Sequence, residues 1–288
     1  MHSPRCRASA RREFDGEINS MLRSIVFAAV FYVTTALFVV LGSFLLFGPR
    51  RYAMMGLKAH AITCLWLLKW IVGTRIKVRG RDKLPEAPYL VASKHQSAWD
   101  TFALIPIFSD PALVMKAELT LIPFYGWFSR KFEHVFVRRE RGPSALRNLV
   151  SDAKQRASAK REILIFPEGT RRMPGSLPDY KPGAVALYEG LGLPCVPMAL
   201  NSGLYWPRRT LRRYPGTIIV EILTPIPAGL PRAKFRALLQ QRIEDASNRL
   251  IFEASEAPDP PPIPTGVAMP PRMAASCADP APSNVKTP

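Results

Sequence analysis

The sequence predicts an α/β domain, a layered mixed sheet flanked by helices, preceded by an N-terminal membrane-associated helical hairpin. Short apolar runs typical of strands alternate with helical patterns between residues 74 and 253. An uncharged apolar segment precedes this region, and a proline-rich stretch without periodicity follows it. These observations divide the chain into a flexible basic tail at 1–20, membrane-anchoring helices at 21–73, one globular domain at 74–253 and a disordered proline-rich tail at 254–288.

The composition favours a membrane partner. The 288 residues carry a formal net charge of +18, which nucleic acid or an anionic membrane surface could balance. The basic residues lie in short scattered pairs without a nucleic-acid-binding motif around them. A long apolar segment lies beside two of these pairs, Arg11-Arg12 and Arg50-Arg51. We therefore expect membrane lipids as partners and no nucleic acid.

The four cysteines are far apart and form no C-x-x-C pair. Cys64 and Cys195 lie in apolar sequence, where a cysteine is typically a small core residue. We expect no disulfide and no structural zinc, as in a reducing compartment.

Residues 24–47 predict a membrane-embedded helix. They carry no charge, and as a helix they would be about 36 Å long, against about 30 Å for the hydrocarbon core. A cleaved signal peptide is the rival interpretation, but the run is longer than such a region and no clear small-residue cleavage pattern follows. Arginines on both flanks give no firm orientation from the positive-inside rule. The helix either spans the bilayer or enters and leaves one leaflet.

Residues 59–73 are apolar but too short to span a membrane. Trp66 and Trp70 lie one helical turn apart, which suits the lipid headgroup interface, although a buried core helix has the same length. Together with the preceding segment, this helix is expected to form a hairpin that seats the protein on the bilayer. We expect the cytoplasmic (inner) membrane, with the globular domain facing the cytoplasm.

The globular domain starts with a strand at 75–79, where polar and apolar residues alternate up to Gly80. Further short apolar runs predict strands at 89–92, 112–116, 135–137, 163–166, 195–200 and 217–222. Helical patterns follow from residue 101 to about 108, over 144–161, from Lys181 on and over 232–252. Residues 119–132 are apolar and aromatic but contain Pro123 and Gly126, which predicts a broken helix, either near the bilayer or in the core.

A histidine and an aspartate lie at the junction between the second strand and its helix, in S-K-H-Q-S-A-W-D. On one continuous helix His95 and Asp100 would point about 140° apart. They can meet if His95 lies in the turn and Asp100 in the first turn of the helix. The carboxylate would then fix the imidazole tautomer and leave the other nitrogen free to take a proton from a substrate hydroxyl. A purely structural histidine is the alternative that this motif alone leaves open.

A second polar loop follows the strand at 163–166, in F-P-E-G-T-R-R. Gly169 permits a sharp turn, and the planar guanidinium group of Arg171 matches phosphate oxygens. By itself the loop could equally be a solvated turn.

The two motifs in this order resemble the glycerolipid acyltransferases, specifically the 1-acylglycerol-3-phosphate acyltransferases. His95 and Asp100 match the family's H-x-x-x-x-D, and Phe166 to Arg171 match its F-P-E-G-T-R. V-F-V-R-R at 135–139 resembles the second family block, and L-P-C-V-P-M-A at 193–199 resembles the fourth. Lys94 stands where the family usually has asparagine, and Glu133 where it usually has glycine. If Lys94 faced His95, its charge would lower the pKa of the imidazole.

The resemblance implies a membrane-bound enzyme that moves a fatty acyl group from a thioester to the sn-2 hydroxyl of 1-acylglycerol-3-phosphate, forming phosphatidic acid. His95 is the implied base and Asp100 its orienting partner. The implied acceptor-binding residues are Arg139, Glu168, Gly169, Thr170 and Arg171. Coenzyme A or acyl carrier protein would carry the donor as a co-substrate, and we expect no cofactor and no metal.

Two alternatives remain from the sequence. An acyltransferase of the same family could act on another lyso-lipid, such as a lyso-ornithine lipid, because residues outside the four blocks contact the acceptor head group. A non-catalytic membrane scaffold is the second, against which the intact motif residues argue. No serine lies in a nucleophile-elbow context, so a covalent acyl-enzyme is not expected.

Overall fold

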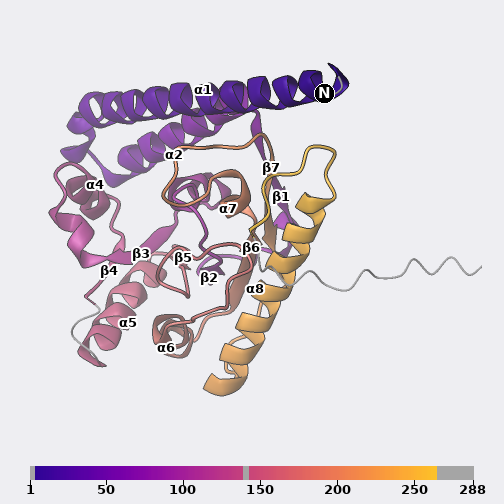
Figure 1. The fold of residues 1–288 in the computed structure, drawn as a ribbon. Coiled ribbons are helices and arrows are strands. Elements are labelled where there is room, and N and C mark those ends of the chain that lie inside the picture. Colours follow the sequence, from indigo (N-terminus) through magenta and orange to yellow (C-terminus); the bar gives the residue numbers. More distant parts are fainter. Residues whose placement is uncertain (1–3, 139–142, 265–288) are drawn as a thin grey trace, which may run out of the picture.

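The computed structural model describes residues 4–138 and 143–264, with side chains from residue 18 onward (Figure 1). Its centre is a seven-stranded sheet in the order β1-β7-β6-β2-β5-β3-β4. The strands are β1 (Thr74–Arg79), β2 (Leu90–Ser93), β3 (Ala112–Lys116), β4 (Val135–Val137), β5 (Ile163–Ile165), β6 (Cys195–Leu200) and β7 (Gly216–Ile222). Neighbouring strands are parallel except β6 and β7, which are antiparallel. The predicted mixed α/β sheet is confirmed, and each predicted strand forms within a residue or two of its expected bounds.

Helices cover both faces of this sheet (Figure 1). They are α1 (Pro4–Leu41), α2 (Arg50–Leu67), α3 (Asp100–Ala103), α4 (Tyr125–Lys131), α5 (Pro143–Ser158), α6 (Pro182–Leu191), α7 (Ser202–Tyr205) and α8 (Arg232–Ser255). Because successive strand residues point to opposite faces, Val91 of β2 packs in the core cluster that holds Phe27 of α1. Its neighbour Leu90 packs with Leu149 of α5 and Phe235 of α8.

The N-terminal helix differs from the prediction in its start. It begins at Pro4, so the described backbone of the expected flexible tail is helical. From residue 18 to Leu41 it is long and apolar enough to cross a membrane. The prediction that the second segment is too short to span is wrong, because its helix begins at Arg50 rather than at residue 59, and the helical segment from Arg50 to Val72 is also long and apolar enough. Figure 1 shows α1 lying across the domain above α2. The ring of Phe27 meets that of Trp206 edge-on, with 5.4 Å between ring centroids.

The segment at 119–132 is broken, as expected. A 3₁₀ helix at Ala117–Leu121 is followed by α4, with Pro123 and Gly126 at the break. Gly126 is required there, since a Cβ atom would lie 2.0 Å from the carbonyl oxygen of Thr120. Several apolar side chains of the segment are exposed, Leu121 by 80 %.

The C-terminal helix α8 extends two residues beyond the predicted domain end at 253, to Ser255. The described residues after it form no regular helix or strand. Cys64 and Cys195 are buried and free, as expected of core residues.

Candidate active site

His95 and Asp100 meet at the carboxyl end of β2. The strand ends at Ser93, the chain turns through residues 94–99, and α3 begins at Asp100. This turn brings Nδ1 of His95 to 3.0 Å from Oδ2 of Asp100. The predicted strand-turn-helix geometry is therefore confirmed. Such a bond places the proton on Nδ1 and makes Nε2 the basic nitrogen.

The Asp100 carboxylate is fully buried and receives four hydrogen bonds. Besides His95, the backbone N–H groups of Gln96 and Ser97 donate to Oδ2, at 2.8 and 2.9 Å. The hydroxyl of Ser202, at the start of α7, donates to Oδ1 at 2.5 Å. Three of these donors are neutral, so the negative charge stays available to stabilise a protonated His95.

His95 is held through both its ring and its backbone. It stacks on Phe166, with 4.0 Å between ring centroids and 18° between planes. The backbone N–H of Arg172 donates to the His95 carbonyl at 2.8 Å. The side chain is 11 % exposed, so the imidazole is fixed but still open to a substrate.

The loop after β5 turns sharply at Gly169, as the sequence predicted. Its φ of +61° is in the left-handed region that favours glycine. Thr170 and Arg171 beyond it are exposed, whereas Glu168 before it is buried.

Glu168 belongs to a buried charge cluster with Lys94. The Lys94 ammonium lies 2.9 Å from Oε1 of Glu168 and 2.8 Å from both carboxylate oxygens of Glu244 on α8. Burial is the main cause that raises the pKa of Glu168, opposed by the nearby Lys94. Lys94 therefore pairs with carboxylates rather than facing His95. Glu168, expected at the acceptor, has its carboxylate turned into the protein.

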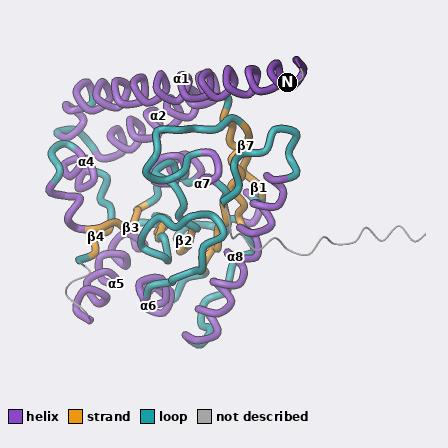
Figure 2. The backbone as a smooth tube through the Cα atoms, in the orientation of Figure 1, coloured by secondary structure: helices purple, strands orange, loops and turns teal. Residues whose placement is uncertain are grey.

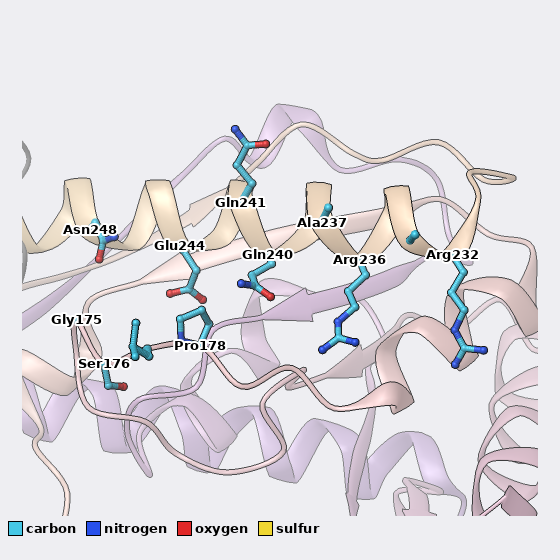
Figure 3. A pocket seen from close by; sticks show the side chains of 12 residues that line it. Gly175, Ser176, Pro178, Arg232, Arg236, Ala237, Gln240, Gln241, Glu244 and Asn248 are labelled. Carbon is cyan, nitrogen blue, oxygen red and sulfur yellow. The ribbon is translucent and has the colours of Figure 1, made fainter.

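Glu244 also lines a cleft of about 1000 Å³ between α8 and residues 175–178. Figure 3 shows its carboxylate pointing from the helix toward that loop, beside Pro178. The hydroxyl of Tyr180 donates to Glu244 Oε1 at 2.9 Å. The cluster thus joins the motif loop, the loop after β5 and the C-terminal helix.

Guanidinium groups gather near the loop after β5. Partial burial and then the charges of Arg209, Arg171 and Arg172 lower the pKa of Arg208. Arg172 is paired with Asp179 at 2.5 Å, whereas Arg171 forms no ion pair within the described residues. The loop between α7 and β7, drawn in teal in Figure 2, carries Arg208 and Arg209. Arg139, the expected second phosphate ligand, lies outside the described residues.

Four residues of the site were not predicted from the sequence: Gln96, Ser202, Arg208 and Glu244. Ser202 lies two residues after β6, a strand that is buried along its whole length. Glu244 lies next to Ile243, beside the buried stripe of α8. Each could be noticed in the sequence, but its partner could not.

A partly exposed histidine bonded to a buried aspartate, near a group of arginines, defines the class of protein: an enzyme that can activate a hydroxyl group of an anionic substrate. Residues 75–201 match the sequence profile of the acyltransferase family. The chain is 36 % identical over 191 residues to the 1-acyl-sn-glycerol-3-phosphate acyltransferase of Pseudomonas aeruginosa, covering 66 % of this chain and 74 % of the relative.

More distant relatives agree. The Saccharomyces cerevisiae enzyme of the same name is 33 % identical over 165 residues, which cover 56 % of this chain and 54 % of the yeast enzyme. A crystal structure of the 1-acyl-sn-glycerophosphate acyltransferase of Thermotoga maritima superposes with a TM-score of 0.68 at 21 % identity, covering 80 % of this chain and 97 % of the other. The chain belongs to the 1-acyl-sn-glycerol-3-phosphate acyltransferase family, as its motifs predicted.

Proposed function

We propose that this enzyme transfers a fatty acyl group from a thioester to the sn-2 hydroxyl of 1-acylglycerol-3-phosphate, forming phosphatidic acid for phospholipid synthesis. The observation that carries the proposal is the His95–Asp100 pair, oriented by four hydrogen bonds to one buried carboxylate. The relatives named for this reaction support the choice of acceptor.

In this mechanism Nε2 of His95 takes the proton of the acceptor hydroxyl while its oxygen attacks the thioester carbonyl. Asp100 stabilises the imidazolium that forms. The tetrahedral intermediate then breaks its C–S bond, and the imidazolium returns the proton to the departing thiolate. The hydroxyl oxygen ends in the new ester, so no acyl-enzyme is formed.

The acceptor phosphate binds the guanidinium groups at the mouth of the site. Arg171 is exposed and Arg208 lies near it, and guanidinium groups pair with phosphate oxygens in a bidentate manner. Gly169 and Thr170 place Arg171 at the end of the turn, and Arg139 completes the set by the family pattern. Glu168 supports the loop from beneath through Lys94.

The donor is an acyl thioester carried by coenzyme A or by acyl carrier protein, and the reaction uses no further cofactor because the thioester is already activated. We place the active site at the cytoplasmic face of the inner membrane. There it can take either donor from the cytoplasm and the lipid acceptor from the bilayer.

Helices α1 and α2 seat the enzyme on the bilayer. Apolar side chains along α1 are exposed, among them Tyr32 by 68 % and Val40 by 63 %, and an exposed apolar face on this scale marks an interaction surface. Because α1 packs along the domain through Phe27, we favour insertion into one leaflet over a full span. The exposed residues around Leu121 and Trp127 extend this seat.

The test is acyl transfer by purified protein in detergent, with 1-acylglycerol-3-phosphate and each donor in turn. Wild type should form phosphatidic acid, and His95→Ala should form about 10²–10⁴-fold less. His2→Ala, outside the region that matches the family profile, is the matched control and should behave as wild type. If the wild type forms product only with another lyso-lipid, such as a lyso-ornithine lipid, the proposed acceptor is wrong. If folded protein forms no product with any acceptor, the whole proposal is refuted.

A further inference from the structure

Ser202 is the one side-chain partner of Asp100 besides His95 within the described residues. We propose that Ser202 is a positioning residue of the catalytic base: its hydroxyl sets the rotation of the Asp100 carboxylate and so keeps Oδ2 directed at His95. This inference rests on the proposed function. It adds a third residue to the His95–Asp100 pair, 102 positions away from Asp100 in the sequence.

The contact has the features of a strong hydrogen bond. Ser202 and Asp100 are both fully buried, and the 2.5 Å separation lies in the range of hydroxyl-to-carboxylate bonds. The other oxygen, Oδ2, receives the three N–H donors from His95, Gln96 and Ser97. Without Ser202, Oδ1 would be a buried carboxylate oxygen with no donor. The carboxylate would then rotate to share the remaining donors between its two oxygens.

The neighbouring residue brings Ser202 to this place. The N–H of Gly203 donates to Oε1 of Gln96 at 3.0 Å, which ties α7 to the motif loop. A Cβ atom at position 203 would lie 2.9 Å from Cβ of Gln96 and 2.8 Å from Cγ of Pro174. Only glycine permits this close approach. Ser202 is therefore held against Asp100 by the packing of α7 between the two motif loops.

The geometry separates this role from that of a nucleophile. In serine hydrolases the serine hydroxyl bonds to the imidazole, and the carboxylate lies on the far side of the ring. Here the order is Ser202, Asp100, His95, so the serine acts on the carboxylate. It orients the base without forming a bond to the acyl group.

The experiment compares Ser202→Ala and Ser202→Thr with a matched control. Ser247→Ala removes another buried serine hydroxyl, one without a hydrogen-bond partner in the described structure. We expect Ser202→Ala to lower kcat about tenfold with KM for the acceptor unchanged, and Ser202→Thr, which keeps a hydroxyl, to recover part of the loss. Ser247→Ala should stay near wild type.

Two further measurements separate positioning from general structural damage. In an Asp100→Asn background, Ser202→Ala should cause no additional loss, because its effect passes through Asp100. The proton NMR resonance of the His95 Nδ1–H, identified by its absence in His95→Ala, should shift in Ser202→Ala and stay in place in Ser247→Ala. The NMR measurement needs no substrate, so it tests the inference even if wild type fails to acylate 1-acylglycerol-3-phosphate. An unmoved resonance, a loss confined to KM, or an undiminished effect in the Asp100→Asn background would overturn it.

Discussion

Asp100 and Glu168 are both buried carboxylates beside the same histidine loop, and they are held in opposite ways. Asp100 accepts hydrogen bonds from two backbone N–H groups, one hydroxyl and His95. Glu168 pairs with the Lys94 ammonium, and its Oε2 has no hydrogen-bond partner among the described residues. Neutral donors leave the charge of Asp100 for the imidazolium, whereas Lys94 neutralises that of Glu168. One carboxylate is thus suited to chemistry and the other to holding the loop in place.

Asp100→Asn is the strongest test of this difference between the two carboxylates. The amide keeps the shape of the side chain but removes the charge that stabilises the imidazolium, so kcat should fall by about 10²–10⁴-fold. Acyl transfer measured beside Asp82→Asn, an exposed aspartate, gives the comparison. A folded Asp100→Asn enzyme with nearly full activity would show that the carboxylate charge plays no part in the reaction.

Lys94→Met should have its largest effect on stability instead. It leaves the carboxylates of Glu168 and Glu244 without their common cation, and breaking a buried ion pair from one side costs about 3–5 kcal/mol. Denaturant unfolding in detergent measures the loss, with exposed Lys77→Met as the control. Lys94→Met combined with Glu168→Gln should recover part of it. Equal stabilities for Lys94→Met and the control would mean that the ion pairs of Lys94 with Glu168 and Glu244 do not stabilise the fold.

Arg171 tests whether the loop after β5 binds the phosphate of the acceptor. Arg171→Ala removes an exposed guanidinium group that has no ion-pair partner among the described residues. It should raise KM for 1-acylglycerol-3-phosphate about tenfold to a hundredfold, since a charge-assisted hydrogen bond contributes about 1.5–3 kcal/mol. The change in kcat should be small. Lys181→Ala, an exposed cation paired with Asp179, is the control. A fall in kcat alone would place Arg171 in the chemical step rather than in acceptor binding.

These residues also show how far the sequence could predict the site. His95 and Asp100 are five positions apart, and a strand followed by a turn and a helix start is a local pattern, so their pairing was predictable. The contact of Lys94 with Glu244 joins residues 150 positions apart. Such partners depend on how α8 packs against the sheet, which periodicity does not specify. The placing of Glu168 at the acceptor came from the family resemblance, which does not specify where the carboxylate points; in the structure it is buried against Lys94.

The smallest expected effect concerns the pH dependence of stability. Burial raises the pKa of Glu168 above its ordinary value of 4.5, so between 4.5 and the raised value the folded protein binds more protons than the unfolded chain. The free energy of unfolding therefore contains a contribution that falls as the pH rises through this interval.

Glu168→Gln removes that contribution, and its cost in stability should be well below that of Lys94→Met because Lys94 keeps its partner Glu244. Unfolding measured from pH 4 upward should give a flatter dependence for Glu168→Gln than for wild type, whereas exposed Glu256→Gln should follow wild type. Identical curves for wild type and Glu168→Gln would mean that Glu168 has the same pKa in the folded and the unfolded protein, because the attraction of Lys94 then offsets the effect of burial.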